Sequence, residues 1–161
     1  RQLSLTPLTR GEWLAATFLW FVTLAFLSAI LLVLVGRAAF GAHVTLPALA
    51  LPFLIVGPTM FVSLGLLAGS ASDSPEAAAV LGNIITFPMM FLSGTFFPVN
   101  EFPAWLQPVA HALPLYYVID GLNASMVFND PAAAYADIAI VAVVTVVLFV
   151  VATRVFNWRE D

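Results

Sequence analysis

Four long apolar runs constrain this chain more than any other feature of its sequence. A helix needs about 20 consecutive apolar residues to cross the hydrocarbon of a membrane, which is roughly 30 Å thick. The clearest run lies between Glu12 and Arg37 and is apolar around its whole circumference, with Trp13 at one edge as an interfacial anchor. We therefore predict an all-α, polytopic membrane protein with about four transmembrane helices.

The composition supports lipid rather than water as the main solvent. The chain has 161 residues, of which 62% are hydrophobic and 9% are charged, whereas soluble domains are about half apolar and a quarter charged. Lysine is absent, and the five arginines form no basic face that could neutralise a row of phosphates, which argues against a nucleic-acid partner. Cysteine is absent as well, so a disulfide or a thiolate metal site cannot form.

The apolar runs define one transmembrane domain over residues 1–161. The second run is longer than one crossing needs, and its prolines place the regular helix in its later part, bent near Pro58. Ser74 is expected to cap the third helix, with Pro75 at its first position and Glu76 at its positive end. The spans are predicted at residues 13–36, 51–69, 76–97 and 131–153.

Three residues inside the predicted spans are candidates for helix packing. Gly65 and Gly69 are spaced so that another helix backbone could approach closely, although two glycines without a partner are an equal alternative. Asn83 is a lone amide in the third span, and such a residue usually faces protein rather than lipid. Helix packing is favoured over a substrate contact for Asn83.

Residues 98–130 are broken by prolines into pieces too short to cross a membrane. We predict a re-entrant helical hairpin between the last two spans. Its first helix would be capped by Asn100, with Pro103 in its first turn and Trp105 on its apolar face. Its second helix would follow Pro114 and bring together Tyr116, Tyr117 and Asp120 within one turn.

The arginines predict the orientation, because cytoplasmic flanks of membrane helices carry the positive excess. In a four-span arrangement Arg1, Arg10, Arg154 and Arg159 lie on one side and Arg37 lies on the other. Both ends are therefore expected in the cytoplasm of a plasma-membrane protein, and the hairpin outside the cell. The flanking parts are a cytoplasmic segment, 1–12, and a cytoplasmic tail, 154–161.

Several kinds of chemistry find no support in the sequence. A P-loop needs a lysine, so ATP cannot be bound by that motif, and no cofactor is expected. His43 and His111 lie far apart with no ligand pair on a helical turn, so a metal site is not expected. The span centres carry no charge, which argues against an ion-coupled carrier. Nothing around Ser125 resembles a nucleophile elbow, which argues against a hydrolase.

A specific resemblance covers residues 87–126, FPMMFLSGTFFPVNEFPAWLQPVAHALPLYYVIDGLNASM. The run ending in LSGTFFP, the short stretch with WLQPV and then LPLYYVIDGL resemble the type-2 ABC transporter permeases in order and spacing. The resemblance implies a non-enzymatic permease subunit that pairs as a homodimer or heterodimer and works with a separate ATPase. It also implies that the chain covers the last four of six helices.

The resemblance carries roles onto particular residues. Near the start of the chain it implies a contact with the ATPase, for which an ordinary helix start is an equal alternative. Those residues are Thr6, Pro7, Leu8, Arg10, Gly11 and Glu12. At the hairpin it implies an extracellular gate, with Gly94 and Pro98 shaping the chain. The gate residues are Ser93, Gly94, Phe97, Pro98, Trp105, Tyr116, Tyr117 and Asp120.

One position departs from the family's pattern. Asn123 stands where the YxxDGLR-like stretch of the family often has arginine. An ion pair from Asp120 at that spacing is therefore impossible, and we expect a local hydrogen bond from Asp120 to Tyr116 or Asn123 instead.

The function predicted from these features is ATP-driven export of an apolar or amphipathic cargo by alternating access, within the lipid bilayer. Two alternatives remain open at this point. The first is a nontransporting membrane scaffold, which a neighbouring ATPase gene would argue against. The second is an ion-coupled carrier or channel, for which transport would persist without ATP.

Overall fold

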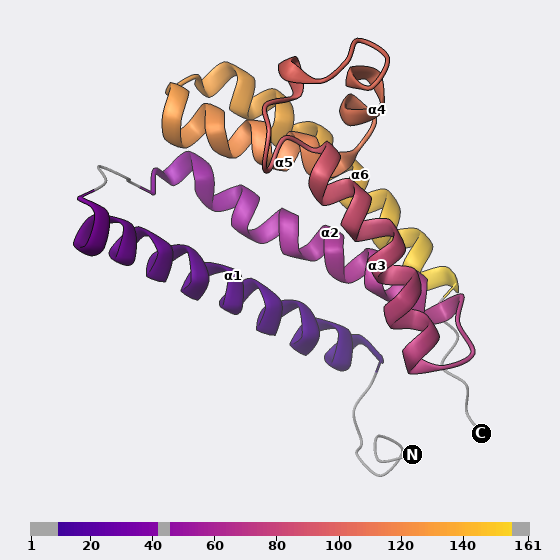
Figure 1. Cartoon of the computed structure of the whole chain (residues 1–161). Coiled ribbons are helices and arrows are strands. Elements are labelled where there is room, and N and C mark those ends of the chain that lie inside the picture. Colours follow the sequence, from indigo (N-terminus) through magenta and orange to yellow (C-terminus); the bar gives the residue numbers. More distant parts are fainter. Residues whose placement is uncertain (1–9, 42–45, 156–161) are drawn as a thin grey trace.

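A computed structural model describes residues 10–41 and 46–155, and over these residues the chain is all-α (Figure 1). Four helices in this part are long and apolar enough to cross a membrane. The prediction of an all-α polytopic protein with four such helices is confirmed. The four helices are α1, Arg10–Phe40, α2, Leu51–Ser70, α3, Pro75–Leu92, and α6, Pro131–Val155.

Short helical pieces fill the stretch between α3 and α6. They are a 3-10 turn at Val99–Glu101, α4 at Gln107–His111, α5 at Pro114–Asn123, and a π-helical turn at Ala124–Phe128. The turn ends at Asn129, whose φ of 51° lies in the left-handed region that closes helices. Asp130 then accepts hydrogen bonds from the amides of Ala132 and Ala133, both at 3.1 Å, and so caps α6.

The first helix of the hairpin was predicted wrongly. Asn100 does not cap a helix but lies within the 3-10 turn, and α4 begins only at Gln107. The physical reason is Pro108, because a helix that ran from Asn100 through this position would lose a backbone hydrogen bond and clash with the preceding turn. Trp105 and Val109 therefore belong to different elements and share no helix face.

The third span ends earlier than predicted. Its start agrees with the sequence, since the Ser74 side chain accepts a hydrogen bond from the Ala77 amide at 3.1 Å and Pro75 opens α3. Its end is at Leu92 rather than at residue 97. Gly94 has a φ of 85°, a left-handed conformation that stops a helix and that glycine adopts without strain.

The core lies where α2, α5 and α6 meet. Phe53 and Met60 of α2 and Val141 of α6 are each at most 1% exposed, and Val118 of α5 joins the same cluster. In Figure 1, α2 runs through the centre of the bundle, and it contacts α1, α3, α5 and α6. By contrast, α1 has no buried residue in its apolar stretch.

The two ends of the bundle differ in what they contain. The start of α1, the turn between α2 and α3, and the end of α6 lie at one end, which we call the terminal end (Figure 1). The segment from α4 to α5, the end of α1 and the start of α2 lie at the opposite end, which we call the hairpin end. A chain that crosses a membrane four times has the start of its first span and the end of its last span on the same side, and α1 and α6 are arranged in this way.

Candidate functional site

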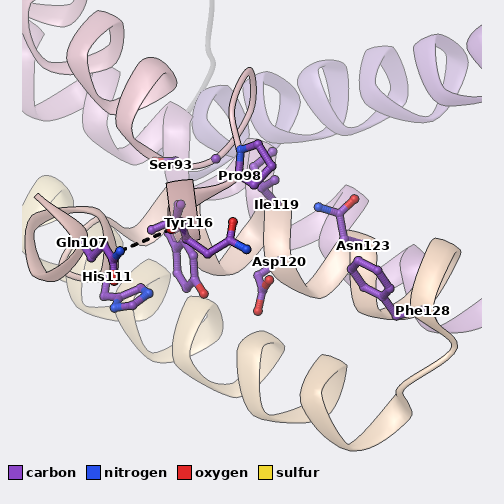
Figure 2. A pocket seen from close by; sticks show the side chains of 12 residues that line it. Ser93, Pro98, Gln107, His111, Tyr116, Ile119, Asp120, Asn123 and Phe128 are labelled. Atoms are coloured by element: carbon purple, nitrogen blue, oxygen red, sulfur yellow. Dashed lines mark hydrogen bonds between the residues drawn. The ribbon is translucent and has the colours of Figure 1, made fainter. Parts of the chain in front are cut away.

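A cavity of about 430 Å³ lies at the hairpin end (Figure 2). Its wall is built from the end of α3, the 3-10 turn, α4, α5 and the π-helical turn. Polar side chains of several kinds take part, and apolar ones close the remainder. The polar lining residues are Ser93, Asn100, Gln107, His111, Tyr116, Asp120 and Asn123, and the others are Gly94, Pro98, Val99, Ile119 and Phe128.

Local hydrogen bonds hold the hairpin around this cavity. The Gln107 side chain donates to the Phe102 carbonyl at 2.9 Å and ties the start of α4 to the loop before it. The Tyr117 hydroxyl donates to the His111 carbonyl at 2.8 Å and ties α5 to the end of α4. Ser93 is fully buried and donates to the Met89 carbonyl at 2.6 Å. The hairpin is therefore a folded unit rather than an open loop.

Aromatic rings form one part of the cavity wall. The rings of His111 and Tyr116 meet edge to face with centroids 4.7 Å apart, and Tyr116 meets Tyr117 in the same way at 5.1 Å. Figure 2 shows His111 beside Tyr116, with Asp120 one turn further along α5. Such pairs favour particular ring orientations, because edge-to-face contacts are more stable than face-to-face sandwiches.

Two carboxylates lie near Tyr116. Asp120 lines the cavity from α5, and Asp137 reaches the same region from α6. Burial, together with the negative charges of Asp120 and Asp137 and the neighbouring Tyr117, raises the pKa of Tyr116 above its ordinary value near 10. The phenol therefore stays protonated at neutral pH and can donate a hydrogen bond.

The polar groups of this region are not all paired. Asp137 is 7% exposed, and its Oδ2 atom has no hydrogen-bond partner among the described residues. The predicted hydrogen bond from Asp120 to Tyr116 or Asn123 is absent from this part of the chain. Asp120 acts on Tyr116 and Asp137 through its charge instead.

Gly121 brings the three core helices together beside these acids. A Cβ atom at Gly121 would lie 2.2 Å from the Phe53 ring of α2 and 3.0 Å from Cβ of Asp137 on α6. Atoms cannot approach that closely, so only glycine allows this spacing of α5 against both neighbours. The glycine thereby sets how near Asp120 and Asp137 come to each other.

The predicted gate residues divide into two groups. Five of the eight line the cavity, namely Ser93, Gly94, Pro98, Tyr116 and Asp120. Phe97 and Trp105 instead point to the surface, with 60% and 73% of their areas exposed, and Tyr117 holds α4 rather than lining the cavity. A gating role for any of them stays a prediction.

Sequence reasoning missed other residues of the site. Asn100, Gln107 and Asn123 line the cavity, whereas the sequence suggested a helix cap for Asn100, a hydrogen bond to Asp120 for Asn123 and no role for Gln107. Asp137 carried a stronger signal, since it is an acid within an otherwise apolar span, a position where ionisable groups usually have a function. Among the described residues no group of three potential metal ligands occurs.

The predicted ATPase contact lies partly outside the described residues. Thr6, Pro7 and Leu8 are not described, and neither is the side chain of Arg10. Gly11 and Glu12 are exposed in the first turn of α1, at the terminal end. This contact stays a prediction.

The predicted packing glycines leave open space where a side chain would begin. A Cβ atom at Gly65 or Gly69 would meet nothing within 4 Å among the described residues, so no other described helix approaches closely on that side. Asn83 is exposed on α3, where it lines a shallow apolar hollow with Val80, Ile84, Phe87 and Pro88. Contact of these residues with a second chain stays a prediction.

Comparison with known proteins gives the family. The profile of the family described as ABC-2 type transporter matches residues 1–127, which include α1, α2, α3, α4 and α5. The chain belongs to the ABC-2 type transporter family. It is thus a multi-pass membrane protein of a transporter family, and the hairpin with its cavity lies almost wholly within the matched residues, while α6 lies beyond them.

Relatives in this family cover α6 as well. The chain is 29% identical to Nodulation protein J of Rhizobium leguminosarum bv. viciae over 154 residues, which is 96% of this chain and 60% of the relative. It is 30% identical to Nodulation protein J of Rhizobium meliloti over 110 residues, 68% of this chain and 42% of the relative. The chain therefore spans about 60% of the length of the first of these relatives. No solved structure shows a significant match.

Proposed function

We propose that this chain is part of the permease subunit of an ATP-driven exporter. The observation that carries the proposal is the match to the ABC-2 type transporter family, which extends from the first residue through the hairpin. Four apolar helices supply the membrane domain that such a subunit needs. The energy comes from a separate ATPase, because the chain has no lysine with which to build a P-loop.

The proposed cargo is apolar or amphipathic. The span centres are uncharged, and large apolar side chains such as Leu32, Ile84 and Phe87 are exposed on α1 and α3. A path between such helices solvates an acyl chain or a ring system at little cost, whereas a charged cargo would lose its hydration there. Alternating access carries the cargo from the terminal end to the hairpin end.

The ATPase partner is proposed to dock at the terminal end. The first turn of α1, with Gly11 and Glu12, lies there together with the turn between α2 and α3 (Figure 1). If this end faces the cytoplasm, the partner reaches it directly. The positive-inside rule supports that orientation, because Arg10 and Arg154 both lie at the terminal end, and Arg37 lies near the other.

A second permease chain is proposed to pack against α3. The hollow around Asn83 exposes Val80, Ile84 and Phe87 beside an amide that lipid cannot hydrogen-bond. An amide at such a position is better satisfied by another helix, which supports a permease pair, either of two copies or of two different chains.

The test of export uses the full-length protein. It is purified in detergent, and an ATP-hydrolysing subunit is expected to come with it. In vesicles that contain both proteins, a fluorescent lipid should move only when ATP is present. Arg10→Glu should reduce this transport and uncouple ATP hydrolysis from it, whereas Arg154→Glu, which changes the same charge on α6, should leave both unchanged.

Other outcomes would favour the alternatives. Copurification of membrane proteins without an ATPase, and no transport of lipid, would support a nontransporting scaffold. Transport that continues in vesicles without the ATPase would support an ion-coupled carrier or channel. Unchanged export by Arg10→Glu would remove that residue from the ATPase contact.

The orientation is tested separately with single cysteines, because none of the 161 residues is a cysteine. A membrane-impermeant maleimide should label Asn129→Cys at the hairpin end in intact cells. It should label Ser72→Cys at the terminal end only after the cells are broken. Labelling of Ser72→Cys in intact cells would reverse the orientation.

A further inference from the structure

The acids at the hairpin end have no positive partner within the described residues. Asp120 and Asp137 act on each other as like charges, yet neither makes an ion pair in this part of the chain. Asp137 is 7% exposed with one oxygen unpartnered. Two carboxylates that repel each other in a partly buried region are costly unless a cation compensates them. The described arginine side chains of Arg37 and Arg154 lie at the end of α1 and in the last turn of α6.

Asp137 faces the cavity region rather than the lipid. It lies on the side of α6 that packs against α5, because its Cβ would be 3.0 Å from a Cβ at Gly121. Its charge acts on Tyr116 and Asp120, and both of these residues line the cavity. The carboxylate of Asp137 is therefore a second negative group that acts on the cavity through Tyr116 and Asp120, although it does not line the cavity itself.

The cavity has the remaining features of a site for an organic cation. Its volume of about 430 Å³ lies within the range of roughly 300–1,000 Å³ found for small-ligand sites. Tyr116 supplies an aromatic ring, and aromatic rings attract ammonium groups through their quadrupole. Asn100 and Asn123 supply amide oxygens that can accept N–H donors. Neither lysine nor arginine lines the cavity, so it holds no permanent positive charge that would attract an anion.

We propose that this cavity binds the ammonium group of an organic amine, with the Asp120 carboxylate and the Tyr116 ring in contact with it. Asp137 adds a second negative charge from α6 without touching the ligand. The proposal does not depend on ATP-driven export, since binding requires only the folded hairpin and α6. The ammonium group can belong to a phospholipid headgroup or to a freely diffusing amine.

The experiment measures binding of benzyltrimethylammonium by equilibrium dialysis against the full-length protein in an uncharged detergent. Saturable binding of about one cation per chain is expected. Asp120→Asn should weaken it about tenfold or more, because the attraction between the carboxylate and the positive charge of the probe is lost. Asp137→Asn should weaken it less, and Tyr116→Leu should weaken it through loss of the ring.

Asp130→Asn is the matched control. It removes one negative charge from the same end of the molecule, while asparagine still caps α6 as Asp130 does. Binding by this variant should stay within about twofold of the natural protein. The proposal is overturned if the natural protein shows no saturable binding, or if Asp130→Asn and Asp120→Asn lose affinity equally. Thermal unfolding of each variant shows that the binding-defective proteins are folded.

Competition distinguishes the two sources of the ammonium group. Short-chain phosphatidylethanolamine should displace the probe if the site takes a lipid headgroup, and phosphatidylglycerol, which has no amine, should not. Displacement by ethanolamine but not by phosphatidylethanolamine would identify a free amine as the ligand. Both results support the site, whereas equal displacement by phosphatidylglycerol would overturn recognition of the ammonium group.

Discussion

The bundle has a packed part, where α2, α5 and α6 meet, and two helices, α1 and α3, with largely exposed faces. These two regions differ in what covers their apolar side chains. Where α2, α5 and α6 meet, Phe53, Met60 and Val141 are covered almost completely by the chain itself. Along α1 and α3, side chains of the same kind, such as Leu32 and Ile84, keep more than 60% of their area exposed. The exposed helix α1 is at least as apolar in sequence as α2 and α6 of the packed part, so apolarity alone does not decide which helix faces protein.

The difference shows what holds each region in place. Lipid tails are as apolar as leucine, so burial of leucine against protein gains little over lipid. Helices then associate where shapes fit closely and polar groups find partners, as at Gly121 against Phe53. The packed part meets that condition within the chain, whereas the exposed face of α3 around Asn83 meets it only if another chain supplies the fit.

The largest effect is expected from Phe53→Ala in the packed part. The ring is 1% exposed and fills the space beside Gly121. Its removal should lower the free energy of unfolding by about 3–5 kcal/mol, the range for buried Phe→Ala substitutions. Phe21→Ala on α1 is the matched control, since Phe21 is exposed, and it should change stability by less than about 0.5 kcal/mol. Reversible unfolding in mixed micelles measures the stability of both variants. Equal losses of stability would contradict the difference between the packed part and α1.

Gly121→Ala tests the same contact from the other side. The added methyl group would overlap the Phe53 ring, which is buried and cannot swing away. Overpacking of this kind costs about 1–3 kcal/mol. Gly65→Ala adds the same group where nothing lies within 4 Å, and it should stabilise α2 by up to about 1 kcal/mol, because alanine favours helices over glycine. The two unfolding energies should thus change in opposite directions.

A loss of stability in Gly121→Ala together with a gain in Gly65→Ala would support the difference between the packed part and the exposed helix faces. If Gly121→Ala is as well tolerated as Gly65→Ala, α5 does not sit against α2 as closely as described. The same experiment reports on the candidate site, because a displaced α5 would separate Asp120 from Asp137. Binding of the ammonium probe by Gly121→Ala should then fall together with stability.

Local features of the fold could be predicted from the sequence. The four apolar runs gave four long helices, and Ser74 followed by Pro75 gave the start of α3, since both depend on neighbouring residues only. The first hairpin helix was predicted wrongly, because Asn100 was given more weight as a cap than Pro108, which lies eight positions later and prevents a helix that starts at Asn100. Competing local signals of this kind are decided by the packing of the whole segment.

The candidate site was predictable only in part. The motif around Ser93, Tyr116 and Asp120 pointed to residues that do line the cavity. Asp137 and Phe53 could not be assigned to it, because their neighbours in space, Asp120 and Gly121, lie on a different helix. No spacing rule connects such positions before the helices are placed.

Ser74→Ala should have a smaller effect, on α3 alone. It removes the side-chain oxygen that accepts the Ala77 amide, and loss of such a cap costs about 1 kcal/mol. Ser74→Asp keeps an acceptor at the same place and should restore stability. Hydrogen exchange at the first turn of α3 measures the change, and exchange in the packed part should not respond. Faster hydrogen exchange in α2 and α6 as well would show that the stability of these helices depends on α3, although α3 is largely exposed.

The smallest effect is expected at Asn83, and it should appear only between chains. The amide is exposed within this chain, so Asn83→Val should leave unfolding of the single chain unchanged. If a second permease chain packs against α3, the variant should weaken the pair by about 0.6 kcal/mol, the average for interhelical hydrogen bonds in membranes. Energy transfer between labelled permease chains diluted in lipid vesicles measures this, and Asn83→Gln, which keeps an amide, should restore part of the loss. If Asn83→Val pairs as strongly as the natural chain, the face of α3 around Asn83 contacts lipid, as α1 does, and is not an interface between chains.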